Sequence, residues 1–319
     1  MVHGKDNPNA GDADSALAVP SDLSDTTSIA SFVFKYRQQH GRTYHAYKTD
    51  GEYKPYFMPN DARESERLDH QHTLFMTQDD RLYLCPAGKD KPMQRVLDIG
   101  TGTCDEHPGT NVIGVDLCAI QPEFVPPNVE FFVDDLEQEW NFVQPFDFIY
   151  SRGMAGAIKD WPKLMAQAYR HLRPGGWIEL YDPDTRLCCD DGSVPEDSAL
   201  SRWNALMLEA AAENGAPIDS ALEYKQQLID AGFQNVRQVE FKWPSNTWPK
   251  DKKWKEVGAW ANMNMMEALQ GMTTMLFTSV LGWSPADVEL LLVDVRKDFK
   301  NRDYHAYWPM YVVYGQKPE

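Results

Sequence analysis

The stretch that decides the fold is VLDIGTGT at residues 96–103. A short apolar run that ends in glycine is typical of a buried strand followed by a sharp turn. Because glycine has no Cβ, the backbone of a D-x-G-x-G turn can pass close to a ligand. In open α/β sheets, ligands sit beyond the carboxyl ends of the strands. Asp98, Gly100 and Gly102 are therefore candidate binding residues; the alternative is a structural strand-to-turn transition.

Apolar runs of the same kind recur downstream. They span residues 111–116, 129–135, 146–150 and 177–181. Between the last two, residues 161–172 carry apolar side chains at helical spacing, and the pattern stops at RPGG, residues 173–176. Strands that alternate with helices predict an α/β fold with a parallel, doubly wound sheet.

Counting the run that ends at Gly100 as the first, acidic residues close the second and third runs. Asp116 ends the second, where a carboxylate can accept both hydroxyls of a ribose. Asp134 and Asp135 end the third, where a carboxylate or a neighbouring amide can reach an adenine edge. Three successive strand ends thus present groups suited to an adenosine moiety. Against this, Asp116 can be a helix cap, and one of Asp134 and Asp135 is expected to be a solvated loop charge.

The flanking segments predict additions to this core. Residues 1–27 offer little to bury and predict a disordered tail. Residues 28–90 predict a helical extension or lid: one helix at 28–40, and a second that opens at Pro59-Asn60-Asp61, with Asn60 or Asp61 as its cap.

The Rossmann-like domain is expected to occupy residues 91–319. Residues 247–303 predict a largely helical insertion, which lies between strands expected at 236–241 and 304–316.

Composition excludes several classes of protein. The formal net charge is −17 and no basic patch reverses it, so direct binding of nucleic acid is not expected. The five cysteines have no CxxC spacing, which argues against a zinc site or a disulfide framework. No signal peptide pattern and no apolar run of about 18 residues is visible, so no membrane association is expected. A reduced intracellular setting, cytoplasmic or nuclear, fits best.

Taken together, these motifs resemble class I S-adenosylmethionine-dependent methyltransferases. More narrowly, they resemble the LaeA-like methyltransferases of filamentous fungi. The wider resemblance rests on residues 96–102, 112–116, 146–152, 159–162 and 171–179. The narrower one adds Tyr53, residues 59–61, 67–69 and 125–128, His72 and Gln121-Pro122.

The resemblance implies a mostly parallel seven-stranded sheet with an antiparallel final hairpin. It implies S-adenosylmethionine as the cofactor. Its contacts would be Asp98, Gly100, Gly102, Asp116, Asp134 and Asp135, with Arg152 on the methyl and substrate side. Tyr53 is a further candidate contact that closes the donor pocket, and the alternative for it is aromatic packing within the lid.

The chain departs from the family where the glycine loop should lead into a helix. The third glycine of G-x-G-x-G is absent, and eleven residues, 101–111, separate Gly100 from Val112. A parallel crossover with its helix needs at least about 10–12 residues and usually more. About two turns are missing, which is expected to uncover one face of the first two strands. A gene-model artefact, a divergent protein that binds the donor poorly and a shortened loop that still binds all stay open.

Three functions compete at this stage. The first is a methyltransferase that acts on a small molecule in fungal secondary metabolism. The second is a regulatory or pseudo-enzyme protein with a protein partner, because the LaeA-like group includes regulators. The third is a nicotinamide-dependent dehydrogenase, which fits poorly because the last glycine of G-x-G-x-x-G is missing. No general base is identifiable.

Overall fold

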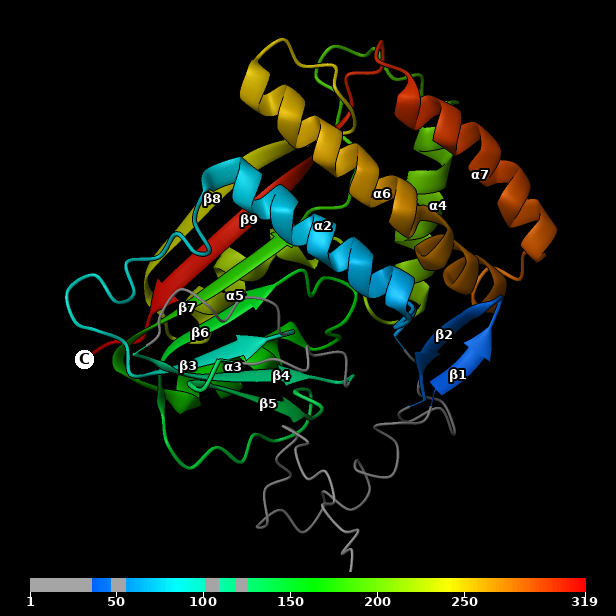
Figure 1. The fold of residues 1–319 in the computed structure, drawn as a ribbon. Helices are drawn as coiled ribbons and strands as arrows, with labels where there is room; N and C mark the ends of the chain where they lie inside the picture. Colours follow the sequence, from blue (N-terminus) through cyan, green and yellow to red (C-terminus); the bar gives the residue numbers. More distant parts are fainter. Residues whose placement is uncertain (1–35, 47–55, 101–108, 119–125) are drawn as a thin grey trace, which may run out of the picture.

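The computed structural model describes residues 36–46, 56–100, 109–118 and 126–319. A seven-stranded sheet of order β5-β4-β3-β6-β7-β9-β8 forms its centre (Figure 1). Its strands are β3 (Arg95–Ile99), β4 (Asn111–Asp116), β5 (Val129–Val133), β6 (Phe146–Arg152), β7 (Leu172–Pro183), β8 (Gln234–Pro244) and β9 (Tyr307–Gln316). The strands from β5 to β7 are parallel, and β9 pairs antiparallel with β7 and β8. The predicted α/β fold with its antiparallel final hairpin is confirmed.

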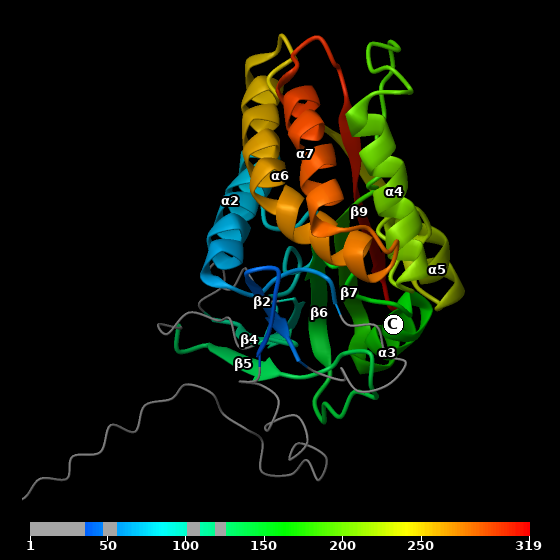
Figure 2. The same ribbon diagram turned by 90° about the vertical axis from the view of Figure 1, so that its right-hand side faces the viewer.

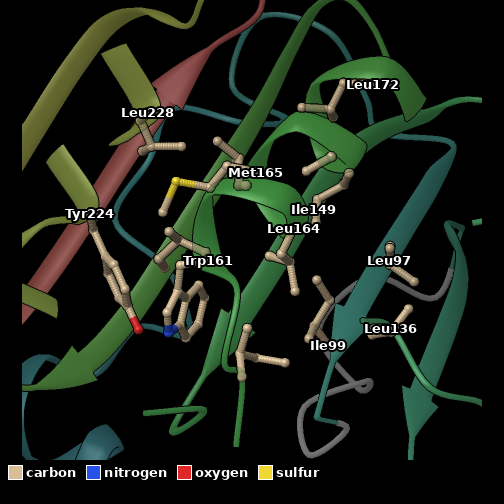
Figure 3. Close-up of a cluster of buried hydrophobic side chains, with 14 of the residues drawn as sticks. Leu97, Ile99, Leu136, Ile149, Trp161, Leu164, Met165, Leu172, Tyr224 and Leu228 are labelled. Atoms are coloured by element: carbon tan, nitrogen blue, oxygen red, sulfur yellow. The ribbon is translucent and has the colours of Figure 1, made fainter. Parts of the chain in front are cut away.

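One face of the sheet is covered by α3 (Trp161–His171) and α5 (Tyr224–Asp230). The helix α3 begins where the Asp160 side chain accepts the Lys163 N–H, and it ends where β7 begins. Figure 3 shows its apolar side chains, Leu164 and Met165 among them, between the helix and the strands of the sheet. Both are at most 1% exposed, so α3 holds the centre of the largest core.

The opposite face is covered by α2 (Ala62–Asp79) and by the segment that leads from it to β3. The Asp61 side chain accepts the Glu64 N–H, so α2 begins as predicted. The segment is fixed by the buried Glu179 carboxylate, which accepts the N–H groups of Leu84 and Cys85 at 2.8 and 2.6 Å.

The expected exposure of the first two strands is wrong. Val96 on β3 and Val112 on β4 are only 8% and 5% exposed. They belong to a core cluster with Cys85, Ala87 and Met93, so the chain just before β3 packs on this face. The two strands stay paired along their length, from Arg95 opposite Asn111 onward.

Three further helices pack against one another, and one of them also packs on β8 and β9 of the sheet. They are α4 (Ala199–Glu213), α6 (Lys252–Ser279) and α7 (Pro285–Lys300), and a short 3-10 turn, η1 (Ser220–Leu222), precedes α5. Figure 2 shows α4, α6 and α7 together above the sheet. Their shared core is aromatic, with Trp203 and Phe299 in edge contact at 5.9 Å between ring centroids. The helical pattern predicted for 247–303 therefore becomes α6 and α7.

The helix predicted at 28–40 is wrong for the residues described there. Residues 36–45 form a hairpin of β1 (Tyr36–Gln39) and β2 (Arg42–His45). Its two turn residues, His40 and Gly41, have φ angles of +51° and +74°. Positive φ at both central positions suits the right-handed twist of paired strands, so this turn fixes a hairpin and interrupts a helix. The tail predicted at 1–27 lies outside the described residues.

Within the described ranges, no helix combines the length and the apolarity that crossing a membrane requires.

The core under α3 can be tested by deletion of one side chain. Leu164→Ala is expected to lower the free energy of unfolding by about 2–5 kcal/mol, because it leaves a cavity in a packed core. Urea denaturation measures this loss. Leu290→Ala is the control, because Leu290 is 69% exposed and its removal should cost little. Equal losses for both variants would contradict the packing described here.

Candidate functional site

The predicted site lies where β3, β4 and β5 end side by side. The Gly100 N–H donates to the Val115 carbonyl at 2.9 Å, and the Asp134 N–H donates to the Asp116 carbonyl at 3.0 Å. These bonds hold the turn after each strand against its neighbour. Asp98, which is 3% exposed, lies on β3 opposite Gly114. The structure therefore brings Asp98, Gly100, Asp116 and Asp134 to one edge of the sheet.

Asp116 carries the most informative carboxylate of this edge. Its Oδ1 accepts the Cys118 N–H at 2.8 Å, and no lysine or arginine forms an ion pair with it among the described residues. Burial, with a smaller contribution from the charge of Asp98, raises the pKa of Asp116 to about 6. A carboxylate without a cationic partner at a strand end can accept hydrogen bonds from the hydroxyl groups of a ligand.

Asp134 and Asp135 differ in environment. The Asp134 carboxylate accepts the Asp135 N–H at 2.8 Å, and burial raises its pKa. The Asp135 carboxylate accepts the Glu137 N–H and a Gln138 side-chain N–H, both at 3.0 Å, and the residue is 8% exposed. The expectation of a solvated loop charge therefore does not hold for Asp135, which stabilises its own turn. Asp134 is the better placed of the two for a ligand.

Gly100 is required by two constraints. Its φ is +74°, a region that L side chains rarely adopt, and a Cβ built on it would lie 2.2 Å from the Met154 sulfur. Met154 belongs to the loop that follows β6. The turn after β3 and the loop after β6 are thus in direct contact.

That loop is in turn fixed by Asp182, near the end of β7. Its carboxylate is completely buried and accepts the Ala155 N–H and the Tyr224 hydroxyl, each at 2.9 Å. Burial raises the pKa of Asp182 to about 7. Asp182 was not among the site residues predicted from the sequence, although it also stands at the end of an apolar run.

Arg152, the last residue of β6, contacts α2. Its Nη2 lies 2.9 Å from the His72 ring, and its guanidinium lies over the Phe75 ring at 4.5 Å. Both partners belong to α2. A contact of Arg152 with the cofactor stays a prediction, and the geometry shows a packing role between β6 and α2.

The N-terminal extension reaches this edge through the residues just before α2. The Asn60 N–H donates to the Thr43 carbonyl at 2.8 Å, and its side-chain Nδ2 lies 3.8 Å from the Cys118 sulfur. Phe57 packs against Gly156, where an added Cβ would lie 3.1 Å from its ring. Two other predicted site residues, Gly102 and Tyr53, lie outside the described residues.

Buried charges tie the extension to α2 and α6. Arg42 of β2 forms a two-point ion pair with Asp61, in which one contact measures 2.7 Å. Arg67 of α2 donates to Glu64 at 2.8 Å and to the Asn264 side chain of α6 at 2.6 Å. These side chains, which have little contact with water, therefore connect the β1–β2 hairpin to α2 and α2 to α6.

A surface groove of about 920 Å³ lies between the start of α4 and α7. Its lining includes Arg202, Trp283 and Asp298, and none of it comes from the sheet. The groove is thus separate from the strand-end site. Among the described residues, no group of three or more His, Cys, Asp or Glu side chains is arranged to hold a metal ion.

The methyltransferase domain family matches residues 68–238 of the chain, which is more than half of its length. This chain belongs to the methyltransferase family. Methyltransferase pytC of Aspergillus terreus is 40% identical over 304 residues, which cover 92% of each protein. The secondary metabolism regulator LAE1 of Cochliobolus heterostrophus is 33% identical, covering 88% of this chain and 94% of the regulator.

The chain is therefore a class I methyltransferase of the fungal LaeA-like group, as its motifs predicted, and its cofactor is S-adenosylmethionine. Among solved structures, a phosphoethanolamine N-methyltransferase 2 of Haemonchus contortus is 14% identical. It matches with a TM-score of 0.44 over 94% of this chain and 75% of that protein.

The contact between Gly100 and Met154 can be measured against a matched glycine. Gly41 has the same φ of +74° but open space around it. Gly41→Ala should therefore cost only the backbone strain, about 1–2 kcal/mol. Gly100→Ala should cost more, because Met154 must also move. The free energy of unfolding of both variants decides this, and equal costs would show that Met154 yields freely.

The buried Asp182 predicts a pH dependence of stability. Its folded pKa of about 7 is above the ordinary value of 3.8, so the folded state binds this proton more tightly. This contribution to stability is present at low pH and is lost as the pH rises toward 7. Compared with Asp182→Asn, the wild type should thus lose stability between pH 5 and pH 8. The melting temperatures of the two proteins at pH 5 and pH 8 measure this. An equal change in melting temperature for both proteins would contradict the prediction.

Proposed function

We propose that this methyltransferase binds S-adenosylmethionine at the carboxyl ends of β3, β4 and β5 and methylates a small molecule of fungal secondary metabolism. The observation that carries the proposal is the Asp116 carboxylate, which ends β4 without a cationic partner among the described residues. It fits the ribose hydroxyls of the cofactor. The kinship with methyltransferase pytC supports the proposal for the whole chain.

The described residues have distinct roles in this proposal. Asp116 accepts the ribose hydroxyls, and Asp134 faces the adenine end. Gly100 lets the backbone approach the cofactor, because glycine has no Cβ. Asp182 fixes the loop that carries Met154.

When bound, S-adenosylmethionine supplies a methyl group that its positively charged sulfur activates for displacement. The protein's task is then to hold that methyl group and the accepting atom in line, and proximity and orientation can supply much of the rate. No described residue is assigned as a general base.

A regulatory role is the second candidate, and the kinship with the regulator LAE1 favours it. A regulator of this kind would act through a protein partner. It would bind the cofactor weakly or not at all if the eleven residues between Gly100 and Val112 are too few for the donor loop. Cofactor binding therefore separates the two candidates.

Calorimetric titration with S-adenosylhomocysteine tests the proposal directly. The wild type should bind, and Asp116→Asn should bind about 10- to 100-fold more weakly, because hydrogen bonds to a charged acceptor are lost. Asp294→Asn is the control, since Asp294 is exposed on α7 and should leave the affinity unchanged. No binding by the wild type at millimolar ligand would overturn the proposal.

The same titration carries a pH signature. Because the pKa of Asp116 is raised to about 6, the carboxylate is ionised at pH 7.5 and mostly protonated at pH 5. Wild-type affinity should thus fall between these values, whereas Asp116→Asn should lack this component. An identical pH response in both proteins would exclude Asp116 from the contact.

A further inference from the structure

His45, at the end of β2, has a side chain whose polar atoms are left without partners. The residue is 4% exposed, and neither ring nitrogen makes a hydrogen bond within the described part of the chain. Buried polar groups are hydrogen-bonded in the great majority of cases, because leaving one unpaired costs free energy. A ring with two such atoms at this position therefore calls for a partner.

The hairpin register gives the direction of this ring. Arg37 pairs with Tyr44, and Tyr36 pairs with His45, so the two pairs point to opposite faces. The first face turns toward α6, where Arg37 Nη2 lies 4.0 Å from the Met275 sulfur. His45 is on the other face, where its ring stacks on Tyr56 at 6.3 Å between centroids and an interplanar angle of 27°.

This second face lies over the strand ends. Tyr56 precedes Phe57, which packs against Gly156 in the loop after β6. Asn60, a few residues further on, contacts Cys118 just after β4, and its Oδ1 is another buried atom that has no hydrogen-bond partner in the described ranges. The extension thus brings unpaired polar atoms to the edge where Asp116 ends β4.

Charged groups on two loops of that edge act on the His45 ring. Burial, then the charge of Arg37 and less strongly that of Lys159, lower the pKa of His45 to about 4, and Asp135 opposes them. Asp135 follows β5, and Lys159 stands just before α3. At physiological pH the ring is thus neutral, with one N–H donor and one acceptor nitrogen.

These features suit a nucleoside better than an ionic ligand. A neutral imidazole matches adenine and ribose, whose edges offer both donors and acceptors. A carboxylate or a phosphate would instead need a cation. The loop after β5 is also the one whose acidic residues were assigned to the adenine end.

We propose that His45 is a binding residue for the nucleoside part of S-adenosylmethionine, contributed by the N-terminal hairpin. The inference rests on the proposed function, since it assumes that the cofactor occupies the ends of β4 and β5. It makes the hairpin part of the cofactor site, in addition to its contacts with α6.

The test compares His45→Phe and His45→Gln with the wild type by calorimetric titration. S-adenosylhomocysteine is the first ligand, and 5′-methylthioadenosine, which lacks the amino acid end, is the second. His45→Phe should bind both about five- to tenfold more weakly, because it keeps a ring but loses the hydrogen bonds. His45→Gln, which retains a donor and an acceptor, should recover part of the loss.

Thermal unfolding without ligand separates this role from a structural one. His45→Phe should unfold at the same temperature as the wild type or higher, because it removes two unpaired buried polar atoms. His305→Gln serves as the control for both measurements, since His305 is 41% exposed and pairs with Asp191.

The outcomes distinguish the two proposals. If the wild type binds and His45→Phe binds equally well, the inference about His45 is overturned and the proposed function stands. If the loss appears with S-adenosylhomocysteine but not with 5′-methylthioadenosine, His45 acts on the amino acid end and the inference is again overturned. If the wild type binds neither ligand, both proposals fail.

Discussion

The buried carboxylate of Asp182 is the constraint on which the geometry of the site depends. Its hydrogen bonds join β7, the loop after β6 and Tyr224, and the residue is completely buried. Met154 of that loop occupies the space that any side chain at Gly100 would need. A displacement of the Asp182 loop would therefore reach the turn after β3, because close-packed groups transmit shifts to their neighbours. The position of the turn after β3 thus depends on Asp182 of β7, which lies two strands away in the sheet.

The N-terminal extension provides the second set of constraints. Arg42 is paired with Asp61, and Arg67 connects α2 to Asn264 of α6. A buried ion pair contributes little net stability, because desolvation offsets its attraction, yet loss of one partner leaves an uncompensated charge. Such pairs therefore favour one arrangement of hairpin, α2 and α6 over others. This arrangement holds His45 and Asn60 at the strand ends.

Local sequence patterns were sufficient for the sheet and for half of the site. Asp116 and Gly100 follow short apolar runs, so their place at a strand end is encoded within a few residues. Glu179 and Asp182 could not be assigned in this way, because their partners lie 95 and 42 positions away in Leu84 and Tyr224. From the sequence alone, a buried carboxylate on a strand has the same pattern as any other acidic residue at a strand end. The difference lies in its hydrogen-bond donors, which only the structure provides.

The hairpin was missed for a different reason. The helix at 28–40 was predicted from apolar side chains at helical spacing, and most of them lie before residue 36, where the described residues begin. His40 and Gly41 adopt positive φ, which ends any helix and joins two strands. Glycine at position 41, directly after the predicted helix, was the available signal for a turn.

The short link after Gly100 changes which groups can recognise the cofactor. In the family, the helix after the glycine turn offers free N–H groups and the positive end of its dipole to the carboxylate of the cofactor. The sequence predicts little room for such a helix in this chain, because only eleven residues, Pro108 and Gly109 among them, separate Gly100 from Val112. We therefore expect recognition to rely more on the nucleoside end, where the proposed contacts are the Asp116 carboxylate and the His45 ring of the hairpin. Loss of contacts at one end of a ligand raises the share of the binding free energy that the other end has to supply.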